Sequence, residues 1–487
     1  MAGIQGSHTV LDNWPVTGLI LINNFQNTLM SLKDRNKISI RGKKISVIGL
    51  GKSGYAATLL AHHLGGKVFA SDLGSTQEIL DRTNLLHQKG VQCETGQHSD
   101  RIYDADLFIV SPGISKDANI LSKAQDHKIP IVGEIEFASW FTEAPIIAVT
   151  GSNGKTTTVH ILVAMCQSDS VNGELAGNMG IPFSEKVIDE IKHPDPNRVY
   201  ILEISSFQME FIYHFKPKIG IFLNISPDHL DRHRTMAEYV AMKLNMVQNQ
   251  ISTDAVVFNS DDPQLATSLK DYPSQKLPFS LLQSNVTFPL NATKVYDTDG
   301  EPFVYMYEVA LPGKHNLANM LAAATAANHI GIDKKNIADV MKSFAGVEHR
   351  LEHVKKLNDI LYINDSKATN LESVIVALES FDKPVVLILG GRNKGADFRL
   401  LLPHTKRHVK LIISYGEAGG EIAAALGDAV RLERVTSLMD AVATAHTLAS
   451  PGDIVLLSPG CASFDQFSNF EERGQQFKSW VDELEVN

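Results

Sequence analysis

A glycine-rich turn between a strand and a helix is the feature that most constrains this chain. The apolar run Ile146–Thr150 leads into the turn, and a helical stretch follows from Lys155. A turn of this kind aims backbone N–H groups and the positive end of the helix dipole at an anion. Lys155 can then reach the terminal phosphates of ATP, while the Thr156 or Thr157 hydroxyl can hold Mg²⁺. The residues of the expected phosphate loop before Lys155 are Gly151, Ser152, Asn153 and Gly154.

This loop is shorter than the common phosphate-binding motif G-x-x-x-x-G-K-[ST]. Val149 stands five residues before Gly154, where that motif has a glycine. A structural turn with a solvated lysine is the alternative interpretation. Because the strand, the glycines and the hydroxyls occur together, we favour a nucleotide site.

Three successive series of short apolar runs alternate with helical stretches, which indicates α/β blocks with parallel sheets. At 487 residues the chain is also too long for one hydrophobic core. We expect a Rossmann-like N-terminal domain, a central P-loop ATPase-type domain and a Rossmann-like C-terminal domain. The predicted boundaries are an N-terminal extension at 1–40 and domains at 41–142, 143–345 and 346–487. The expected strands are Ile45–Ile48, Lys67–Ser71, Leu107–Ser111, Ile129–Val132, Ile146–Thr150, Tyr200–Ile204, Gly220–Ile225, Ala255–Asn259, Leu361–Asn364, Val385–Leu389, Leu411–Ser414 and Ile454–Leu457.

Charge and cysteine content limit the classes of partner. The formal net charge is -10, from 55 acidic and 45 basic side chains, which argues against a nucleic-acid or anionic-membrane partner. The three cysteines lack CxxC spacing, so they favour neither disulfides nor a zinc site. The apolar stretch Val16–Ile22 is too short to cross a bilayer, and we expect a cytoplasmic monomer without membrane insertion. Translation from Met30 and an ordered N-terminal extension are both open interpretations of residues 1–40.

A second glycine motif follows the first expected strand. Residues 49–54, with the sequence GLGKSG, fit G-x-G-x-x-G, and Asp72 ends the next expected strand. An acidic group at that place would meet a ribose hydroxyl. The motif therefore predicts that the first domain binds a nucleotide or its diphosphate, without saying which one. A purely structural turn is the alternative.

Further polar residues follow strands of the central block. Glu203 lies at the end of the expected strand Tyr200–Ile204, where a carboxylate beside a phosphate loop suits Mg²⁺. The segment 227–233 offers more ligands, among them His229, although a surface turn would explain its other charges. Asn316 and Asn319 lie one helical turn apart and either face a purine or ribose or form a cap and a polar helix face.

Polar loops also end successive strands of the third block. They are 348–352, 363–370, 390–397 and 458–465. Open α/β sheets bind ligands at the carboxyl ends of their strands. One such loop can be structural, but several together predict a binding site.

In this order, the motifs resemble those of the Mur ligase family. The resemblance runs from about Ile45 to the C-terminus. INDSKATN together with the SPGCASFDQF run is specific to the branch that adds D-glutamate to UDP-N-acetylmuramoyl-L-alanine. The matching strings are TGSNGKTTT (150–158), GNMG (177–180), LEISSFQ (202–208), NISPDHLDRH (224–233), GKHNLAN (313–319), HRLE (349–352), INDSKATN (363–370), GGRNKG (390–395), SPGCASFDQF (458–467) and NFEERG (469–474).

The resemblance implies a reaction and three substrates held by three domains. ATP activates the carboxylate of UDP-N-acetylmuramoyl-L-alanine as an acyl phosphate. The D-glutamate amine attacks that group, and a peptide bond, ADP and phosphate result. Phosphoryl transfer between two anions requires Mg²⁺ and cations that neutralise the developing charge, in agreement with the residues present. The implied role is peptidoglycan precursor synthesis in the cytoplasm.

By matching position, the resemblance assigns roles to single residues. Lys155 is expected to contact the ATP phosphates. The expected metal ligands are Thr156, Glu203 and His229. The residues expected to flank the reacting groups are Asn178 and His229. Lys243 matches a lysine that family members carry as a carbamate, formed from CO₂ and the neutral amine. The residues expected to bind nucleotide and phosphates are Asn316, Asn319, Arg350, Asp365 and Lys367. Those expected at the UDP-linked substrate are Gly51, Ser53, Asp72, Gly113, Asn178 and Ser205, and those at D-glutamate are Lys367, Thr369, Lys394, Ser463, Phe464 and Phe470.

Two positions depart from the family pattern. Leu73-Gly74 stands where a Thr-Arg pair touching the uracil is expected, and Phe464 stands where a smaller leucine is common.

Three other kinds of function remain as alternatives. Another Mur ligase or a folylpolyglutamate synthase would take a different amino acid, and an NAD-dependent dehydrogenase would leave the Lys155 loop unexplained. A non-catalytic nucleotide-binding protein would have no need of Lys155, Glu203, His229, Lys243 and Asp365 together.

Overall fold

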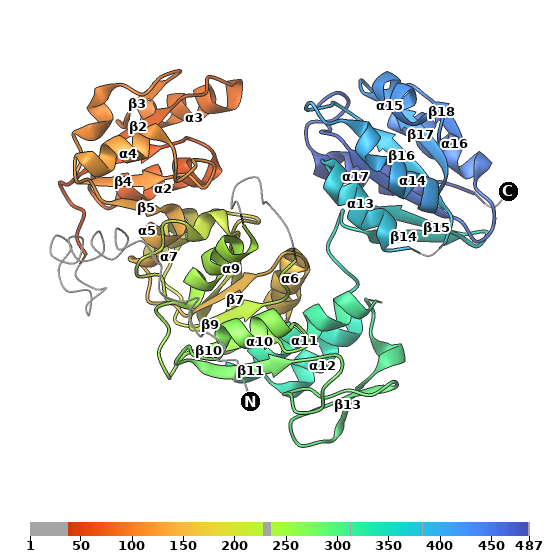
Figure 1. Cartoon of the computed structure of the whole chain (residues 1–487), viewed down its shortest axis with the longest axis horizontal. Coiled ribbons are helices and arrows are strands. Elements are labelled where there is room, and N and C mark those ends of the chain that lie inside the picture. The colour runs from red at the N-terminus through yellow and green to blue at the C-terminus, as the bar shows by residue number, and fades with distance from the viewer. Residues whose placement is uncertain (1–37, 227–234, 312, 382, 486–487) are drawn as a thin grey trace, which may run out of the picture. The chain divides into compact units, whose positions relative to one another are not determined.

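The computed structural model of the chain describes residues 38–226, 235–311, 313–381 and 383–485. The chain divides into two compact units, which join between Ser343 and Phe344 (Figure 1). Each unit is an α/β structure, as the sequence predicts. Most of residues 1–40, with Met30, and the segment 227–234, with His229, lie outside the described residues.

The first sheet of the N-terminal unit is parallel and has the strand order β3-β2-β1-β4-β5. Chain order reverses between β1 and β4, so a crevice is expected at the carboxyl ends of these two strands. The strands are β1 (Lys44–Ile48), β2 (Lys67–Asp72), β3 (Gln92–Thr95), β4 (Leu107–Val110) and β5 (Ile131–Gly133). The helices are α2 (Lys52–His63), α3 (Gln77–Gln88), α4 (Asn119–Asp126) and α5 (Glu134–Ser139).

The second sheet of this unit is also parallel, with the order β11-β10-β9-β6-β8-β7. Its inner strands are continuous apolar runs because helices cover both faces. The strands are β6 (Ile146–Thr150), β7 (Asn172–Gly177), β8 (Arg198–Glu203), β9 (Ile219–Phe222), β10 (Ala255–Asn259) and β11 (Gln275–Phe279). The helices are α6 (Lys155–Met165), α7 (Phe183–Lys192), α9 (Met236–Leu244), α10 (Pro263–Leu269), α11 (Lys314–His329) and α12 (Lys334–Ser343), beside the hairpin β12 (Lys294–Tyr296) and β13 (Pro302–Tyr305).

The buried carboxylate of Glu136 in α5 joins the two sheets of the N-terminal unit. It accepts hydrogen bonds from Trp140 Nε1 (2.8 Å) and from the backbone N–H groups of Tyr213 (3.1 Å), His214 (2.9 Å) and Phe215 (2.8 Å). Hydrogen bonds to an ionised group are the strong ones, and they compensate for its removal from water. One hydrophobic core cluster also runs through both sheets. The first sheet is therefore fixed to the central one.

The C-terminal unit has a mixed sheet with the order β14-β15-β19-β16-β17-β18, in which only the β14–β15 pair is antiparallel among the described strands. Alternate residues of β16 enter two core clusters, Leu387 and Leu389 on one face and Val386 and Ile388 on the other. The strands are β14 (Glu352–Leu357), β15 (Ile360–Asn364), β16 (Val385–Gly390), β17 (Val409–Tyr415), β18 (Leu432–Arg434) and β19 (Ile454–Gly460). The helices are α13 (Leu371–Glu379), α14 (Leu402–His408), α15 (Gly419–Leu426), α16 (Leu438–Leu448) and α17 (Phe470–Asp482).

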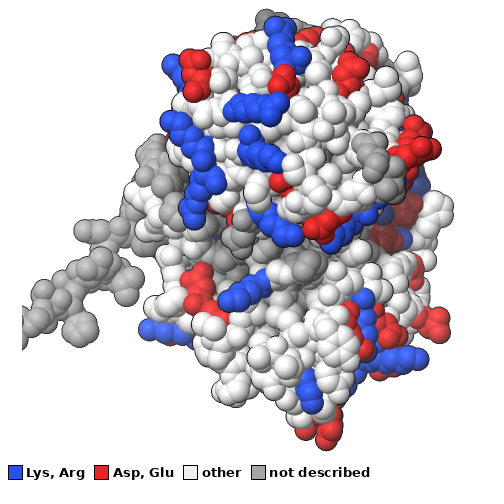
Figure 2. Space-filling view, turned by 90° about the vertical axis from the view of Figure 1, so that its right-hand side faces the viewer, with Lys and Arg blue, Asp and Glu red and all other residues white. Residues whose placement is uncertain are grey.

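The α/β class is confirmed, and each strand expected from the sequence overlaps a strand of the structure. The domain boundaries near 142 and 345 remain predictions. None of the helices in the described ranges has the length and apolar character that a bilayer crossing requires. Figure 2 shows acidic and basic side chains interspersed over one face of the molecule.

Glu134, at the start of α5, meets the first turn of α7. Its Oε1 accepts a hydrogen bond from the backbone N–H of Ser184 at 2.6 Å, while its buried Oε2 has no hydrogen-bond partner within the described residues. Burial raises the pKa of Glu134 to about 7. The Glu134 carboxyl group is therefore mostly protonated in the folded protein at mildly acidic pH.

We predict that Glu134→Gln makes the fold less sensitive to rising pH. Because the folded pKa is raised above the unfolded value, this carboxyl stabilises the fold at low pH, and the contribution is lost as the pH rises through about 7. The melting temperature of the variant minus that of the wild type should grow between about pH 5.5 and about pH 8.5, by the equivalent of about 2 kcal/mol. The exposed Glu143→Gln is the control and should show no such trend. Equal pH profiles for Glu134→Gln and the wild type would contradict the prediction.

Candidate functional site

The glycine turn predicted from the sequence connects β6 to α6. Gly154 has φ +84°, and a side chain there would place its Cβ 2.4 Å from Asn319 Oδ1 in α11. Only glycine fits this backbone conformation and this close approach. Lys155 Nζ donates to the carbonyl oxygens of Gly151 (2.8 Å) and Ser152 (2.9 Å), so the ammonium group lies over the loop. Lys155, the loop and Asn319 are therefore together, as the sequence analysis expects.

The segment after β9 anchors this loop. Ser152 donates its backbone N–H to the carbonyl oxygen of Asn224 (3.1 Å) and its hydroxyl to that of Ser226 (2.9 Å). Asn153 donates its N–H to Asn224 Oδ1 at 2.9 Å. Tyr239 of α9 places its hydroxyl 3.1 Å from Ser152 Oγ. Sequence reasoning missed these anchors, although Asn224 and Ser226 lie in one of the matching strings.

Glu203 ends β8 beside the phosphate loop and is 2% exposed. Asn178 Nδ2 donates to its Oε1 at 2.9 Å, and the Asn178 backbone N–H donates to the Glu203 carbonyl at 2.8 Å. The buried Oε2 has no hydrogen-bond partner within the described residues. A buried carboxylate oxygen left over in this way fits an oxygen-seeking cation such as Mg²⁺.

The described residues do not form a cluster of His, Cys, Asp or Glu large enough to hold a metal by themselves. In proteins Mg²⁺ is usually held by one or two carboxylates together with substrate phosphates and water. Thr156, buried in the first turn of α6, is the hydroxyl that the sequence analysis assigns to the metal. His229, the other assigned ligand, lies outside the described residues.

Lys243 reaches the phosphate loop from α9 and is 1% exposed. Its Nζ donates to the Gly151 carbonyl at 3.0 Å and lies 3.5 Å from Thr150 Oγ1. It also lies 4.5 Å from the centroid of the Tyr239 ring. The amine that the resemblance assigns to a carbamate is thus buried beside the loop.

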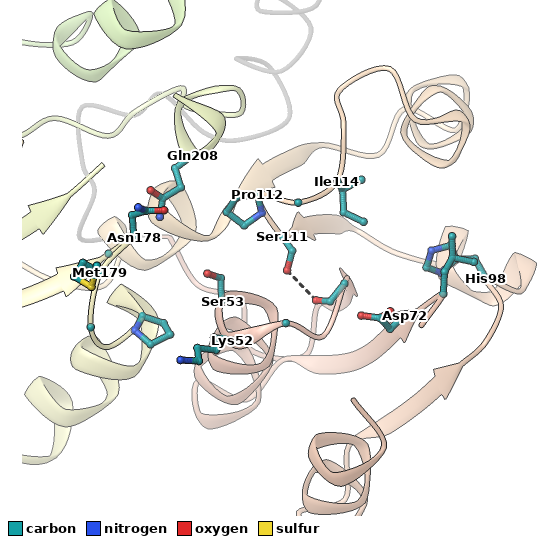
Figure 3. A pocket seen from close by; sticks show the side chains of 17 residues that line it. Lys52, Ser53, Asp72, His98, Ser111, Pro112, Ile114, Asn178, Met179 and Gln208 are labelled. Atoms are coloured by element: carbon teal, nitrogen blue, oxygen red, sulfur yellow. Dashed lines mark hydrogen bonds between the residues drawn. The ribbon is translucent and has the colours of Figure 1, made fainter. Parts of the chain in front are cut away.

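A cavity of about 550 Å³ opens at the carboxyl ends of β1 and β4 (Figure 3). Its lining comes from the first sheet and from the segments that follow β7 and β8. Among the lining residues predicted from the sequence are Gly51, Ser53, Asp72, Gly113 and Asn178. Lys52, His98, Met179 and Gln208 also line it and had no predicted role. Leu73, which departs from the family pattern at the expected uracil contact, lines it as well.

The glycine motif shapes this cavity. A Cβ on Gly54 would lie 1.8 Å from the Gly49 carbonyl oxygen, so the turn requires glycine there. Asp72 Oδ2 accepts the Leu50 N–H at 2.5 Å, and its Oδ1 accepts the Gly74 N–H at 2.6 Å. The carboxylate predicted to meet a ribose therefore also holds the turn in place. Ser205 does not line the cavity but donates its N–H and its hydroxyl to Gln208 Oε1 (2.9 and 3.1 Å).

A second group of predicted residues lies in the C-terminal unit. Asp365 accepts hydrogen bonds from Ser458 Oγ (2.8 Å) and from the Leu351 N–H (3.3 Å). Burial nevertheless raises the pKa of Asp365 to about 7. Lys367 follows in the same loop, and its N–H donates to the His349 carbonyl at 3.1 Å.

The fully buried Arg473 fastens this loop to the one after β19. Its guanidinium donates to Ser366 Oγ (3.0 Å), to the Ser366 carbonyl (2.7 Å) and to the Cys461 carbonyl (3.1 Å). Ser463 is buried in the second loop, whereas Phe464 is exposed. Phe470 packs edge-on against His349, and Lys394 is exposed after β16.

Comparison with known proteins decides the family. Models of the MurD N-terminal domain, the Mur ligase middle domain and the Mur ligase glutamate ligase domain match residues 44–120, 149–327 and 349–461. The UDP-N-acetylmuramoylalanine–D-glutamate ligase of Christiangramia forsetii is 41% identical over 91% of this chain and 100% of its own length. The chain belongs to the Mur ligase family. Relatives with the same name from Salinibacter ruber and Pelotomaculum thermopropionicum are 38% and 40% identical over 91% and 90% of this chain, and over 99% and 97% of their own lengths.

Solved Mur ligase structures share the fold. The UDP-N-acetylmuramate–alanine ligase MurC of Thermotoga maritima aligns with a TM-score of 0.52 at 20% identity over 90% of this chain and 99% of its own. The MurF ligase of the same organism, in complex with ADP, aligns with a TM-score of 0.51 at 14% identity over 92% and 96%. The three-domain α/β architecture of this Mur ligase is thereby confirmed.

We predict that Gly154→Ala weakens ATP binding by about tenfold or more, since the new Cβ would meet Asn319 and the residue would keep a left-handed φ. Titration calorimetry with the non-hydrolysable ATP analogue AMP-PNP measures the change. Gly331→Ala is a matched control, because Gly331 has φ +88° but no neighbour within 4 Å of an added Cβ. Equal losses in the two variants would show that a general effect on the fold, and not the close approach to Asn319, weakens ATP binding.

Proposed function

We propose that this Mur ligase adds D-glutamate to UDP-N-acetylmuramoyl-L-alanine at the expense of ATP. The observation that carries the proposal is the 41% identity to the Christiangramia forsetii ligase along that protein's whole length. The adjoining phosphate loop and cavity support it, because the reaction requires a triphosphate beside a UDP-linked carboxylate. The cytoplasm supplies ATP, and we propose that compartment and a monomeric enzyme.

The alternative functions explain less of the structure. A dehydrogenase would use the glycine turn at 49–54 but not the Lys155 loop or the buried Glu203. A non-catalytic protein would not require a buried Lys243 and a buried Glu203 at one phosphate loop. Another amino-acid ligase is the nearest competitor, and the D-glutamate ligases that match 91% of this chain argue against it.

In the proposed mechanism, the loop N–H groups and Lys155 bind the ATP phosphates. A carboxylate oxygen of the UDP-linked substrate attacks the γ-phosphorus, the bond to ADP breaks, and an acyl phosphate forms. The D-glutamate amine then attacks the acyl carbon, loses a proton and expels phosphate. Asn178 lines the cavity and donates a hydrogen bond to Glu203, and in this mechanism it orients the reacting carboxylate. Because phosphoryl transfer requires little covalent help, positioning and charge neutralisation account for most of the catalysis.

Glu203 and Thr156, with His229, are the residues that we propose to hold Mg²⁺, which when bound neutralises charge on the transferred group. From the resemblance to the family we propose a CO₂-derived carbamate on Lys243 as a further anionic group at this place, and the burial of Lys243 beside the loop is compatible with it. The remaining assignments are proposals of the same kind. Asn316, Asn319, Arg350 and Asp365 bind nucleotide, and the D-glutamate site consists of Lys367, Thr369, Lys394, Ser463, Phe464 and Phe470.

We predict that Lys155→Ala lowers kcat by about two orders of magnitude or more, because a preorganised positive charge at the transferred phosphate is lost. Phosphate release from ATP, in the presence of UDP-N-acetylmuramoyl-L-alanine and D-glutamate, is the measurement. The exposed Lys335→Ala in α12 is the matched control and should retain full activity. A fully active Lys155→Ala would place the catalytic centre elsewhere, and phosphate release that does not depend on both substrates would refute the proposed function.

A further inference from the structure

The cavity has two ends, with the glycine turn between them (Figure 3). Asn178, Met179 and Gln208 lie at one end, close to the phosphate-transfer residues. Asp72 and His98 lie at the other. In Rossmann-like domains the phosphates lie at the glycine turn and the ribose at the acidic residue that ends the second strand. With a UDP-linked substrate, as in the proposed function on which this inference rests, the uracil therefore lies at the His98 end.

The segment after β2 offers the base little polar contact. Leu73 is 65% exposed and lines the cavity, so it gives the base an apolar surface. The Gly74 N–H is already bound to Asp72 Oδ1, and the Leu50 N–H to Asp72 Oδ2. Neither Leu73 nor Gly74 has a side chain that can form a hydrogen bond. These two side chains therefore leave the base edge to other polar groups that line the cavity.

His98, after β3, has its orientation and its tautomer set by the buried Ser71. Ser71 Oγ lies 2.6 Å from His98 Nδ1 and 2.7 Å from Glu94 Oε1. The hydroxyl has one proton, and the carboxylate is the stronger acceptor, so Ser71 donates to Glu94. Its oxygen then accepts from His98 Nδ1–H, and in the neutral ring Nε2 is an acceptor.

The charge state of both partners agrees with this network. Burial lowers the pKa of His98, in spite of the opposing effects of Glu94 and Asp72, so the ring is neutral at physiological pH. Burial raises the pKa of Glu94, but hydrogen bonds from Ser99 and Ser71 outweigh it and lower the pKa overall, so Glu94 is ionised. Because Nδ1 is held by Ser71, the Nε2 edge of the ring is the one that remains for the cavity.

We propose that His98 selects the nucleobase by accepting a hydrogen bond at Nε2 from the N3–H group of uracil. Cytosine has no proton on N3, so its lone pair would face the lone pair of Nε2. His98 is thus a specificity-determining residue, and Ser71 is a positioning residue that fixes its tautomer. No motif marks His98, and it takes over the base contact that the Leu73-Gly74 departure removes.

The test is titration calorimetry of the full chain with UDP and with CDP. The wild type should bind UDP at least about tenfold more tightly than CDP, since a polar site rejects a ligand that leaves its groups unpaired. His98→Ala should weaken UDP binding by about tenfold, leave CDP binding nearly unchanged and so abolish the preference. His98→Gln keeps an acceptor oxygen and should recover part of the preference for UDP over CDP. The exposed His87→Ala in α3 is the matched control and should behave as the wild type.

Kinetics separate this role from a structural one. His98→Ala should raise KM for UDP-N-acetylmuramoyl-L-alanine and leave kcat and the KM for ATP unchanged. A wild type that turns over this substrate but binds UDP and CDP alike, or a His98→Ala variant that keeps the preference, overturns the inference and leaves the proposed function intact. A wild type that neither binds UDP nor uses the substrate refutes the proposed function itself.

Discussion

The hydrogen bond from Asn178 to Glu203 joins the two parts of the site in the N-terminal unit. Glu203 ends β8 beside the phosphate loop, and Asn178 follows β7 and lines the cavity. Because both strands belong to one parallel sheet, their carboxyl ends meet at the same edge as the loop after β6. In the proposed reaction, a triphosphate on the loop and a carboxylate in the cavity would therefore approach each other near this hydrogen bond. The second oxygen of the Glu203 carboxylate, Oε2, has no hydrogen-bond partner within the described residues, so it is available to a cation.

The cavity depends on how the first sheet is fixed to the central one. Its walls come from both, so a movement of either would change its width. The Glu136 carboxylate and the shared core prevent this, since an ionised group that accepts several buried N–H groups is costly to release. The joint has no catalytic group, yet the orientation of a substrate that spans both sheets depends on it.

The sequence predicted the inner strands correctly, whereas the roles of the motif residues remain predictions. Inner parallel strands such as β6 and β16 are buried on both faces and read as continuous apolar runs. The edge strands β3 and β7 were missed, because Gln92–Thr95 and Asn172–Gly177 are polar or contain glycine and have little of that pattern. Lys155 and Glu203 were candidates because each follows an apolar strand in a local sequence motif. The anchors of the loop at Asn224 and Tyr239, and the Ser71–His98 pair, depend on contacts between distant parts of the chain that no local pattern contains.

The proposed function requires that this site joins D-glutamate, and no other amino acid, to the UDP-linked substrate. ATP-dependent phosphate release by the purified chain, with UDP-N-acetylmuramoyl-L-alanine and one amino acid at a time, measures this most directly. We expect release with D-glutamate and only background with L-lysine, diaminopimelate or L-alanine. Strong release with any of these three, and none with D-glutamate, would contradict the claim.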